Sequence, residues 1–221
     1  MKIDHRHTYG IMIDTETCND LTRPICYDIS WQVIDSKGKL YESRSFAVHE
    51  VFADMPDALR TCYYAQKIPS YYANIAKHNK ELIPLAEILL KLDEDIVNYG
   101  CVFICAHNAR FDYRALKITQ EEFSPADDLF NVDLLEWWDT LKMANDTICR
   151  MPTFIKFCRD NGYLTKKNQV RKTAEVLYRF IVRDTEFVEE HEALADVDIE
   201  RQILAYCVRQ HKKMRKTLTS N

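Results

Sequence analysis

Residues 9–17, with the sequence YGIMIDTET, most constrain how this chain can fold. Ile11 and Ile13 predict a buried strand that is apolar on both faces until its end. Asp14 and Glu16 follow two residues apart, and alternation along a strand directs both side chains to the same face. Such neighbouring carboxylates repel each other and lose hydration. A divalent cation with oxygen ligands, Mg²⁺ or Mn²⁺, would offset that cost; the alternative is a solvated strand end that leads into a turn.

The size and composition of the chain fit one folded domain. It has 221 residues, of which 47% are hydrophobic and only 4 are glycine, and it contains no Pro- or Ser-rich linker. A formal net charge of −4 excludes a protein that grips nucleic acid by overall positive charge. It does not exclude an enzyme that acts on nucleic acid with bound cations and a locally basic segment.

The eight cysteines predict neither a zinc site nor a disulfide framework. None forms a CxxC pair, and no histidine pair follows at zinc-ligand spacing. The N-terminal segment lacks the apolar region of a signal peptide, and no apolar run approaches membrane-spanning length. We therefore expect a reduced, cytoplasmic protein without a membrane partner.

Four further segments have the apolar or alternating character of strands: Ile25–Asp35, Leu40–Val48, residues 100–106 and residues 129–134. The Ser36-Lys37-Gly38 turn joins the first two into a hairpin. Three antiparallel strands therefore open the fold, and parallel strands follow them. The prediction is an α/β fold with a central mixed five-stranded sheet flanked by helices, one of which covers residues 135–144.

Residues 55–97 are expected to form a helical insertion. Leucine and isoleucine recur there at helix-like intervals, and Pro69 and Pro84 are expected to break the segment into two or three helices. Its four tyrosines would either stack on nucleobases or pack between helices: Tyr63, Tyr64, Tyr71 and Tyr72. The basic segment 166–183 is either a phosphate-binding face or a solvated helix flank, and the basic tail 210–221 is expected to fray.

A third carboxylate follows the strand at residues 100–106. The sequence HNARFDYRAL after this strand predicts a helix that carries Phe111 and Asp112. Open α/β sheets bind ligands at the carboxyl ends of their strands, which makes Asp112 a candidate metal ligand. The alternative is a first-turn carboxylate that the helix dipole favours.

The last helix, expected within residues 189–208, supplies a fourth carboxylate. At about 100° per residue, Asp196 lies on the same face as Ile199 and Cys207, whereas Asp198 points toward water. A carboxylate on this apolar, core-facing stripe needs a partner. His191 can approach the same site only if it stands in the loop or frayed turn before the helix.

The acidic residues and this histidine, in their order and spacing, resemble the DEDD exonuclease superfamily in its histidine (DnaQ-like) subgroup. The matching pieces are DTE in the first strand, HNARFD after the central strand and HEALAD at the last helix. The tyrosine subgroup would place a tyrosine four residues before the final aspartate, where this chain has Glu192. The resemblance runs from about Tyr9 to Val208 and is weak across residues 55–92.

This resemblance implies a ribonuclease H-like fold, a single exonuclease domain over residues 1–209, and hydrolysis of nucleic acid from a 3′ end with release of nucleoside monophosphates. It implies that two ions, Mg²⁺ or Mn²⁺, are held about 3.5–4 Å apart by Asp14, Glu16, Asp112 and Asp196. His191 would be the general base. The residues that would hold the terminal nucleotide are Thr15, Thr17, Asn108 and Phe111, although Phe111 also fits a role in the core.

The substrate stays open at this level. The general resemblance to stand-alone proofreading domains favours single-stranded DNA, and trimming of RNA 3′ ends uses the same kind of site. A polymerase partner or a second copy of the chain is not determined. A non-catalytic nucleic-acid-binding subunit on the same fold is a second hypothesis, against which the complete set of five site residues argues. A zinc hydrolase lacks the required ligand spacing.

Overall fold

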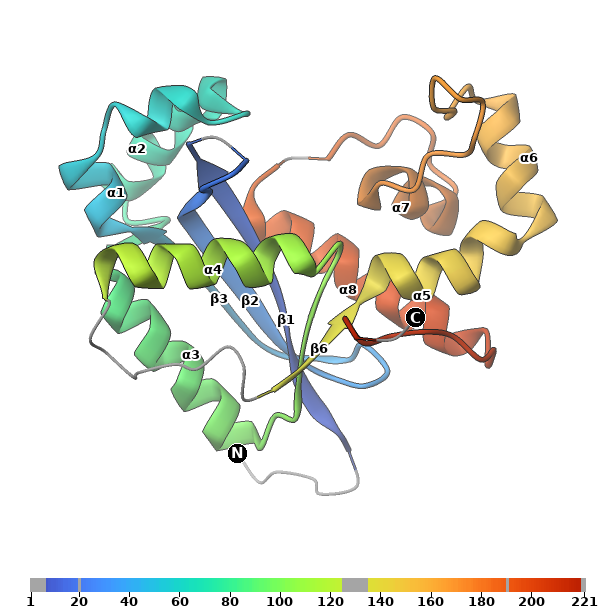
Figure 1. The fold of residues 1–221 in the computed structure, drawn as a ribbon, viewed down its shortest axis with the longest axis horizontal. Helices are drawn as coiled ribbons and strands as arrows, with labels where there is room; N and C mark the ends of the chain where they lie inside the picture. Colours follow the sequence, from blue (N-terminus) through green and yellow to red (C-terminus); the bar gives the residue numbers. More distant parts are fainter. Residues whose placement is uncertain (1–6, 20, 125–134, 190, 220–221) are drawn as a thin grey trace.

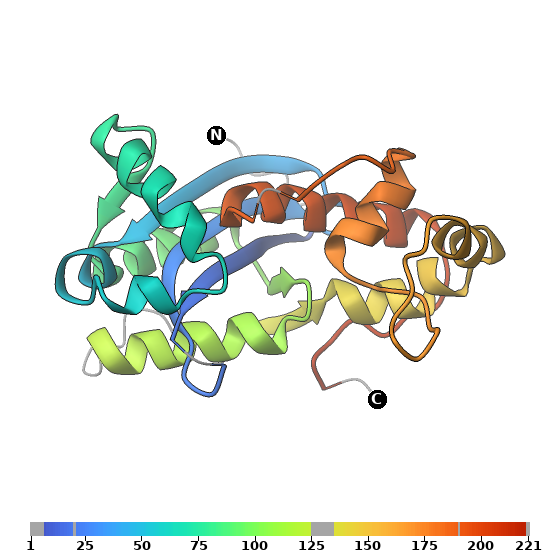
Figure 2. The ribbon, with the colours of Figure 1, turned by 90° about the horizontal axis from the view of Figure 1, so that it is seen from above.

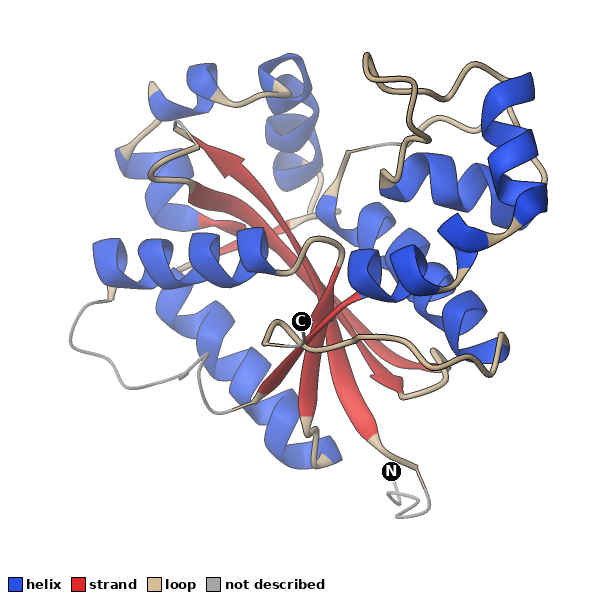
Figure 3. Ribbon diagram, turned by 45° about the vertical axis from the view of Figure 1, so that its right-hand side comes forward, coloured by secondary structure: helices blue, strands red, loops and turns tan. Residues whose placement is uncertain are grey.

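A mixed β-sheet of six strands, in the order β4-β3-β2-β1-β5-β6, forms the centre of the molecule. The computed structural model describes residues 7–19, 21–124, 135–189 and 191–219. Within these ranges the strands are β1 (Tyr9–Cys18), β2 (Ile25–Asp35), β3 (Leu40–Val48), β4 (Glu81–Ile83), β5 (Phe103–Ala106) and β6 (Glu136–Asp139). The first three strands pair antiparallel, whereas β4, β5 and β6 each pair in parallel with a neighbour. Figure 3 shows the sheet flanked by helices, which confirms the expected α/β architecture.

The sheet has one strand more than the five expected, because short strands escape the sequence pattern. β4 has three residues, too few for alternation to be visible in the sequence. β6 forms where a helix is expected, because Trp137 and Trp138 pair with Ile104 and Cys105 of β5. The strand expected at residues 129–134 falls outside the described residues, so the structure does not test it.

Helices cover both faces of the sheet. The α-helices are α1 (His49–Asp54), α2 (Ile68–Ala76), α3 (Leu85–Tyr99), α4 (Arg110–Phe123), α5 (Thr140–Asp146), α6 (Pro152–Asp160), α7 (Ala174–Val182) and α8 (Ala193–Arg209). Three short 3₁₀ helices join them, η1 (Ala58–Thr61), η2 (Ala65–Lys67) and η3 (Ile148–Arg150). Figures 1 and 2 show α4 and α8 on opposite sides of β1. None of the helices in the described part of the chain is long and apolar enough to cross a membrane.

Alternation along β1 divides the apolar core between the two faces. Ile11 and Ile13 belong to the cluster under α3 and α4, together with Trp31 of β2. Met12 points the other way, into the cluster that includes Phe103 and residues of α5, α7 and α8. Because both faces are covered, β1 is apolar on both sides, as its sequence predicts.

The insertion expected at residues 55–97 contains η1, η2, α2, β4 and α3 (Figure 1). The helices are interrupted near Pro69 and Pro84, as expected, and each of these prolines stands at the start of the next helix: Pro69 lies in the first turn of α2, and Pro84 immediately precedes α3. A buried ion pair ties the insertion to the sheet, since Asp28 of β2 accepts a hydrogen bond of 2.6 Å from Lys80 Nζ. Tyr71 donates a second one of 2.6 Å to the same carboxylate, so for Tyr71 the packing alternative is correct.

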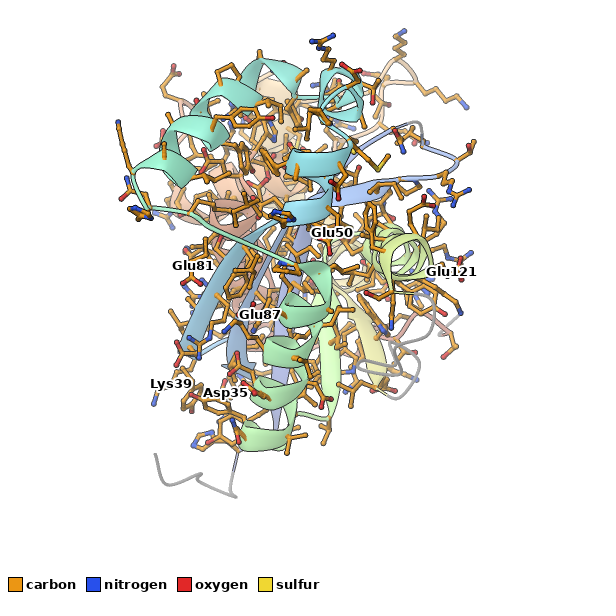
Figure 4. All side chains as sticks on the ribbon, turned by 90° about the vertical axis from the view of Figure 1, so that its left-hand side faces the viewer. Asp35, Lys39, Glu50, Glu81, Glu87 and Glu121 are labelled. Atoms are coloured by element: carbon orange, nitrogen blue, oxygen red, sulfur yellow. The ribbon has the colours of Figure 1, made fainter. Side chains whose placement is uncertain are left out.

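A side chain from α1 completes the start of α3. The carboxylate of Glu50 accepts hydrogen bonds of 3.0 and 3.1 Å from the backbone N–H of Leu85. Figure 4 shows Glu50 beside this end of the helix. The contact satisfies one of the free N–H groups of the first turn and places a negative charge at the positive end of the helix dipole.

The described part of the C-terminal tail packs against β6, whereas the sequence predicts fraying. Asp139 N donates to Lys216 O at 2.7 Å, and Leu218 N donates to Trp137 O at 3.0 Å. Arg215 pairs with Asp146, with a distance of 2.8 Å between Nε and Oδ2. The tail sequence is polar and basic, and the partners that order it lie far away in the chain.

Candidate metal centre

The end of β1 and the first turn of α8 bring three carboxylates together. Asp14, Glu16 and Asp196 each offer an oxygen, and these three oxygens lie within 4.8 Å of one another. The two-residue spacing on β1 directs Asp14 and Glu16 to one face, and α8 packs across β1 and β2. Asp196 lies on the buried side of α8 with Ile199, as the helical periodicity predicts.

Asp112 lies beside this cluster, in the first turn of α4 directly after β5. Its side chain is buried, and its Oδ1 accepts a hydrogen bond of 2.9 Å from the hydroxyl of Thr15. Among the described residues it does not join the group of three within 4.8 Å, yet its charge raises the pKa values of both Asp14 and Glu16. The structure therefore brings together three of the four predicted ligands and places the fourth next to them.

Burial and mutual repulsion disfavour ionised carboxylates at this site. Burial, followed by the charge of Asp196, raises the pKa of Glu16 to about 9. Burial raises the pKa of Asp112 to about 7, against the opposing effect of the Thr15 hydrogen bond. Burial, followed by the charge of Glu200, raises the pKa of Asp14 well above its usual value. A set of neighbouring carboxylates with such pKa values gains most from a bound cation.

Glu200 is a fifth carboxylate that the sequence reasoning missed. It is 3% exposed and lies one helical turn after Asp196 on α8. Its Oε2 accepts a hydrogen bond of 2.9 Å from the backbone N–H of His107, at the end of β5. The charges of Asp112 and Asp196 add to burial in raising its pKa. The four-residue spacing from Asp196 was the available signal, since residues i and i+4 share a helix face.

His191 stands immediately before α8, as the sequence argument requires. Its Nδ1 is 3.6 Å from Glu189 Oε2, and Glu189, His191 and Asp196 form a second group of potential ligand atoms within 4.8 Å. Burial, followed by the charge of Lys67, lowers the pKa of His191 below its usual value. Burial also raises the pKa of Glu189 to about 7. The lowered pKa favours the neutral form of the His191 imidazole, next to the carboxylate cluster.

The four residues expected to hold a nucleotide occupy different environments. The Thr15 side chain is buried and engaged with Asp112, and Phe111 is half-buried against the core cluster under α4. Thr17 is half-buried, and Asn108 is exposed. Asn108 has a φ of +63°, and its N–H donates to Asp139 Oδ1 at 3.1 Å.

Asp198 points away from the cluster, as the helical wheel predicts. Its side chain is 41% exposed, and its Oδ1 is 2.6 Å from Arg201 Nη2. Gln202 donates a hydrogen bond of 2.8 Å to the other carboxylate oxygen. Of Asp196 and Asp198, therefore, only Asp196 faces the cluster.

The donor set fits a hard divalent cation. Apart from His191, the converging atoms are carboxylate oxygens, which Mg²⁺ and Mn²⁺ prefer. The eight cysteines are all free thiols, and neither group of potential ligands contains one, so the donor set does not resemble a structural zinc site. The residues that would hold the ions are Asp14, Glu16, Asp112 and Asp196.

The fold is similar to that of solved nucleases, although no protein-family model and no curated protein sequence matches this chain. A structure described as a full-length 3′-exonuclease has a TM-score of 0.62 and 9% identity, over 95% of this chain and 85% of that one. Cell-death related nuclease 4 has a TM-score of 0.59 and 12% identity, over 95% and 67%. Exonuclease I from Methylocaldum szegediense has a TM-score of 0.57 and 16% identity, over 93% and 41%. These likenesses confirm the ribonuclease H-like fold.

Proposed function

We propose that this protein is a metal-dependent 3′-to-5′ exonuclease of the DEDD type with a histidine base, which releases nucleoside monophosphates from nucleic-acid 3′ ends. The observation that carries the proposal is the convergence of Asp14, Glu16 and Asp196 within 4.8 Å, with His191 beside them. A fold shared with solved nucleases, one of which is described as a 3′-exonuclease, supports the same reaction.

The carboxylates would hold the cations that bind the scissile phosphate. When bound, two divalent ions would neutralise the carboxylates and polarise the phosphate toward attack. Asp14 and Glu16 on β1 and Asp196 on α8 form the part of the site whose oxygens already lie together. Asp112, kept in place by the Thr15 hydroxyl, completes it from α4.

His191 takes the proton of the attacking water. A general base must be unprotonated at the working pH, and burial lowers the pKa of this imidazole. Its Nδ1 faces Glu189 at 3.6 Å, so we assign proton acceptance to Nε2 on the other side of the ring. The Glu189 carboxylate, on the Nδ1 side, stabilises the imidazolium that forms.

The basic loop between α6 and α7 is proposed to bind the nucleic-acid strand upstream of the 3′ end that is cleaved. Its cationic side chains are exposed: Lys166, Lys167, Arg171 and Lys172. The loop reaches the neighbourhood of the cluster through His107, whose Nε2 is 3.1 Å from the carbonyl oxygen of Lys172. Phosphates bound along this loop would direct the 3′ end to the carboxylates, where Thr17, Asn108 and Phe111 hold the last nucleotide.

Single-stranded DNA is the proposed substrate, with RNA 3′ ends as the alternative. The test is digestion of matched, 5′-labelled DNA and RNA oligonucleotides with Mg²⁺ or Mn²⁺, each ending in a 3′-hydroxyl or a 3′-phosphate. We expect a ladder that shortens from the 3′ end, release of mononucleotides, and loss of both with chelator. Asp14→Asn should abolish hydrolysis, whereas Asp198→Asn, the solvent-facing carboxylate of α8, should retain it. Strand binding without release of mononucleotides would instead support a non-catalytic binding subunit.

A further inference from the structure

Tyr64 and His191 form an aromatic stack that joins the insertion to the carboxylate cluster. Their ring centroids are 4.0 Å apart, with an angle of 12° between the ring planes. Tyr64 lies between η1 and η2, at the start of η2, whereas His191 precedes α8. The stack is therefore a tertiary contact between two segments that are far apart in the chain.

The segment that carries Tyr64 is fastened to β1. Asn19 N, just beyond the strand, donates a hydrogen bond of 3.0 Å to Thr61 Oγ1 at the end of η1. The thiols of Cys18 and Cys62 are both buried, and their interaction lowers the pKa of Cys18. Tyr64 is thus held in place by the same strand that carries the carboxylate pair.

The backbone at His191 needs outside contacts to orient the ring. Its φ is +51°, in the left-handed region that residues other than glycine rarely adopt. The side chain is still 27% exposed. Glu189 contacts one edge of the imidazole, at Nδ1, and Tyr64 covers one of its faces. The first contact limits where the edge lies, and the second fixes the plane of the ring.

The Tyr64 hydroxyl is not suited to proton transfer at neutral pH. Burial, followed by the charges of Glu16 and Glu189, raises the pKa of this phenol to about 12. The side chain is therefore neutral and protonated, and it acts on its neighbour through the face of its ring. Stacking of the two rings favours the orientation of the imidazole that lies parallel to the phenol ring over other orientations.

We propose that Tyr64 is a positioning residue for His191, whose imidazole it holds in the plane that directs a ring nitrogen toward the carboxylate cluster. This assignment rests on the proposed nuclease function, in which His191 accepts a proton. It gives the insertion a role in the reaction, since a residue of the insertion orients the base although it contributes no metal ligand.

The kinetic test compares Tyr64→Ala with Tyr64→Phe and with Tyr72→Ala as a matched control. Tyr72 belongs to α2 of the same insertion, is 45% exposed and has its ring contact with Phe52. On a single-stranded oligonucleotide, Tyr64→Ala should lower kcat about 10-fold and leave KM within about twofold, because the loss corresponds to one stack. Tyr64→Phe keeps the ring and should retain near wild-type kcat, as should Tyr72→Ala.

Three kinetic outcomes would overturn the assignment. A higher KM with unchanged kcat in Tyr64→Ala would mean that the tyrosine contacts the substrate rather than the base. An equal loss of kcat in Tyr64→Phe would assign the effect to the hydroxyl. An equal loss in Tyr72→Ala would assign it to general damage of the insertion.

The second test observes the stack without any reaction. The chain has seven histidines, and in protein with labelled histidine the His191 ring signals are identified by their loss in His191→Gln. The ring current of Tyr64 should shift these protons upfield in the wild type and in Tyr64→Phe, but not in Tyr64→Ala. Unchanged signals in Tyr64→Ala, with an active wild type, would overturn the positioning role alone. A wild type without nuclease activity would refute the proposed function, and the positioning role with it.

Discussion

Replacing Glu16 with glutamine should stabilise the metal-free protein at neutral pH. Glu16 has a pKa of about 9 in the folded state, against an ordinary value of 4.5. Between these two values the folded state keeps a proton that the unfolded state has lost, so the free energy of unfolding falls as pH rises. From pH 4.5 to pH 7 this amounts to about 3 kcal/mol, at about 1.36 kcal/mol per unit of pH. Glutamine carries no charge, and the variant avoids this cost.

The assay is thermal or urea unfolding in chelator between pH 5.5 and 8.5. For a chain of this size, about 3 kcal/mol corresponds to a rise in Tm of roughly 6–12 °C for Glu16→Gln. The difference in Tm between Glu16→Gln and the wild type should grow with pH, because only the wild type has the Glu16 carboxyl with its raised pKa. Glu121→Gln, an exposed carboxylate on the outer side of α4 (Figure 4), is the control and should leave the unfolding curve unchanged.

Adding Mg²⁺ or Mn²⁺ should reverse the order of stability, so that the wild type has a higher Tm than Glu16→Gln. A cation that binds the folded state stabilises it by mass action, and the wild type has the complete set of carboxylates. The wild type should therefore gain Tm on addition of metal, whereas Glu16→Gln should gain much less. The reasoning fails if Glu16→Gln in chelator at pH 7.5 is no more stable than the wild type, or if both proteins respond equally to metal.

Three further changes should have separate effects. His191→Gln should lower kcat by about 10²–10⁴-fold without loss of metal-induced stabilisation. In the pH profile of the wild-type initial rate, the acidic limb should lie below the usual histidine pKa, because burial lowers the pKa of His191. Lys80→Met leaves the Asp28 charge buried and should reduce the urea-measured free energy of unfolding by about 3–5 kcal/mol. Arg215→Ala should increase hydrogen exchange in residues 211–219, because it removes the ion pair with Asp146. Asp146 has a pKa of about 2 in the folded protein. The pair therefore contributes its full stability above the usual aspartate pKa, and this contribution is lost as the pH falls toward 2.

Local periodicity is where prediction from the sequence succeeded. Asp14 and Glu16 point to one face because a strand alternates, and their oxygens meet within the cluster. Asp196 is buried and Asp198 is half-exposed because a helix turns by about 100° per residue. The position of His191 before α8 follows from the same geometry. Each of these features depends on residues close together in the chain.

Contacts between distant segments are where prediction failed. β4 is a strand because Glu81–Ile83 lies beside β3, and nothing in three residues indicates that neighbour. The tail is ordered because Arg215 meets Asp146. The sequence did not distinguish Tyr64 from the other three tyrosines of the insertion, and only the fold shows that its ring stacks on His191.

The sequence by itself therefore determined which side chains each strand and helix presents, and with them the candidate ligands and the class of cation they suit. Only the tertiary structure decided which of those side chains meet, since the addition of Glu200 and Tyr64 to the site depends on how α8, β5 and the insertion pack. The physical reason is that secondary-structure periodicity is fixed within a few residues, whereas burial, charge repulsion and stacking depend on partners that only folding brings into contact.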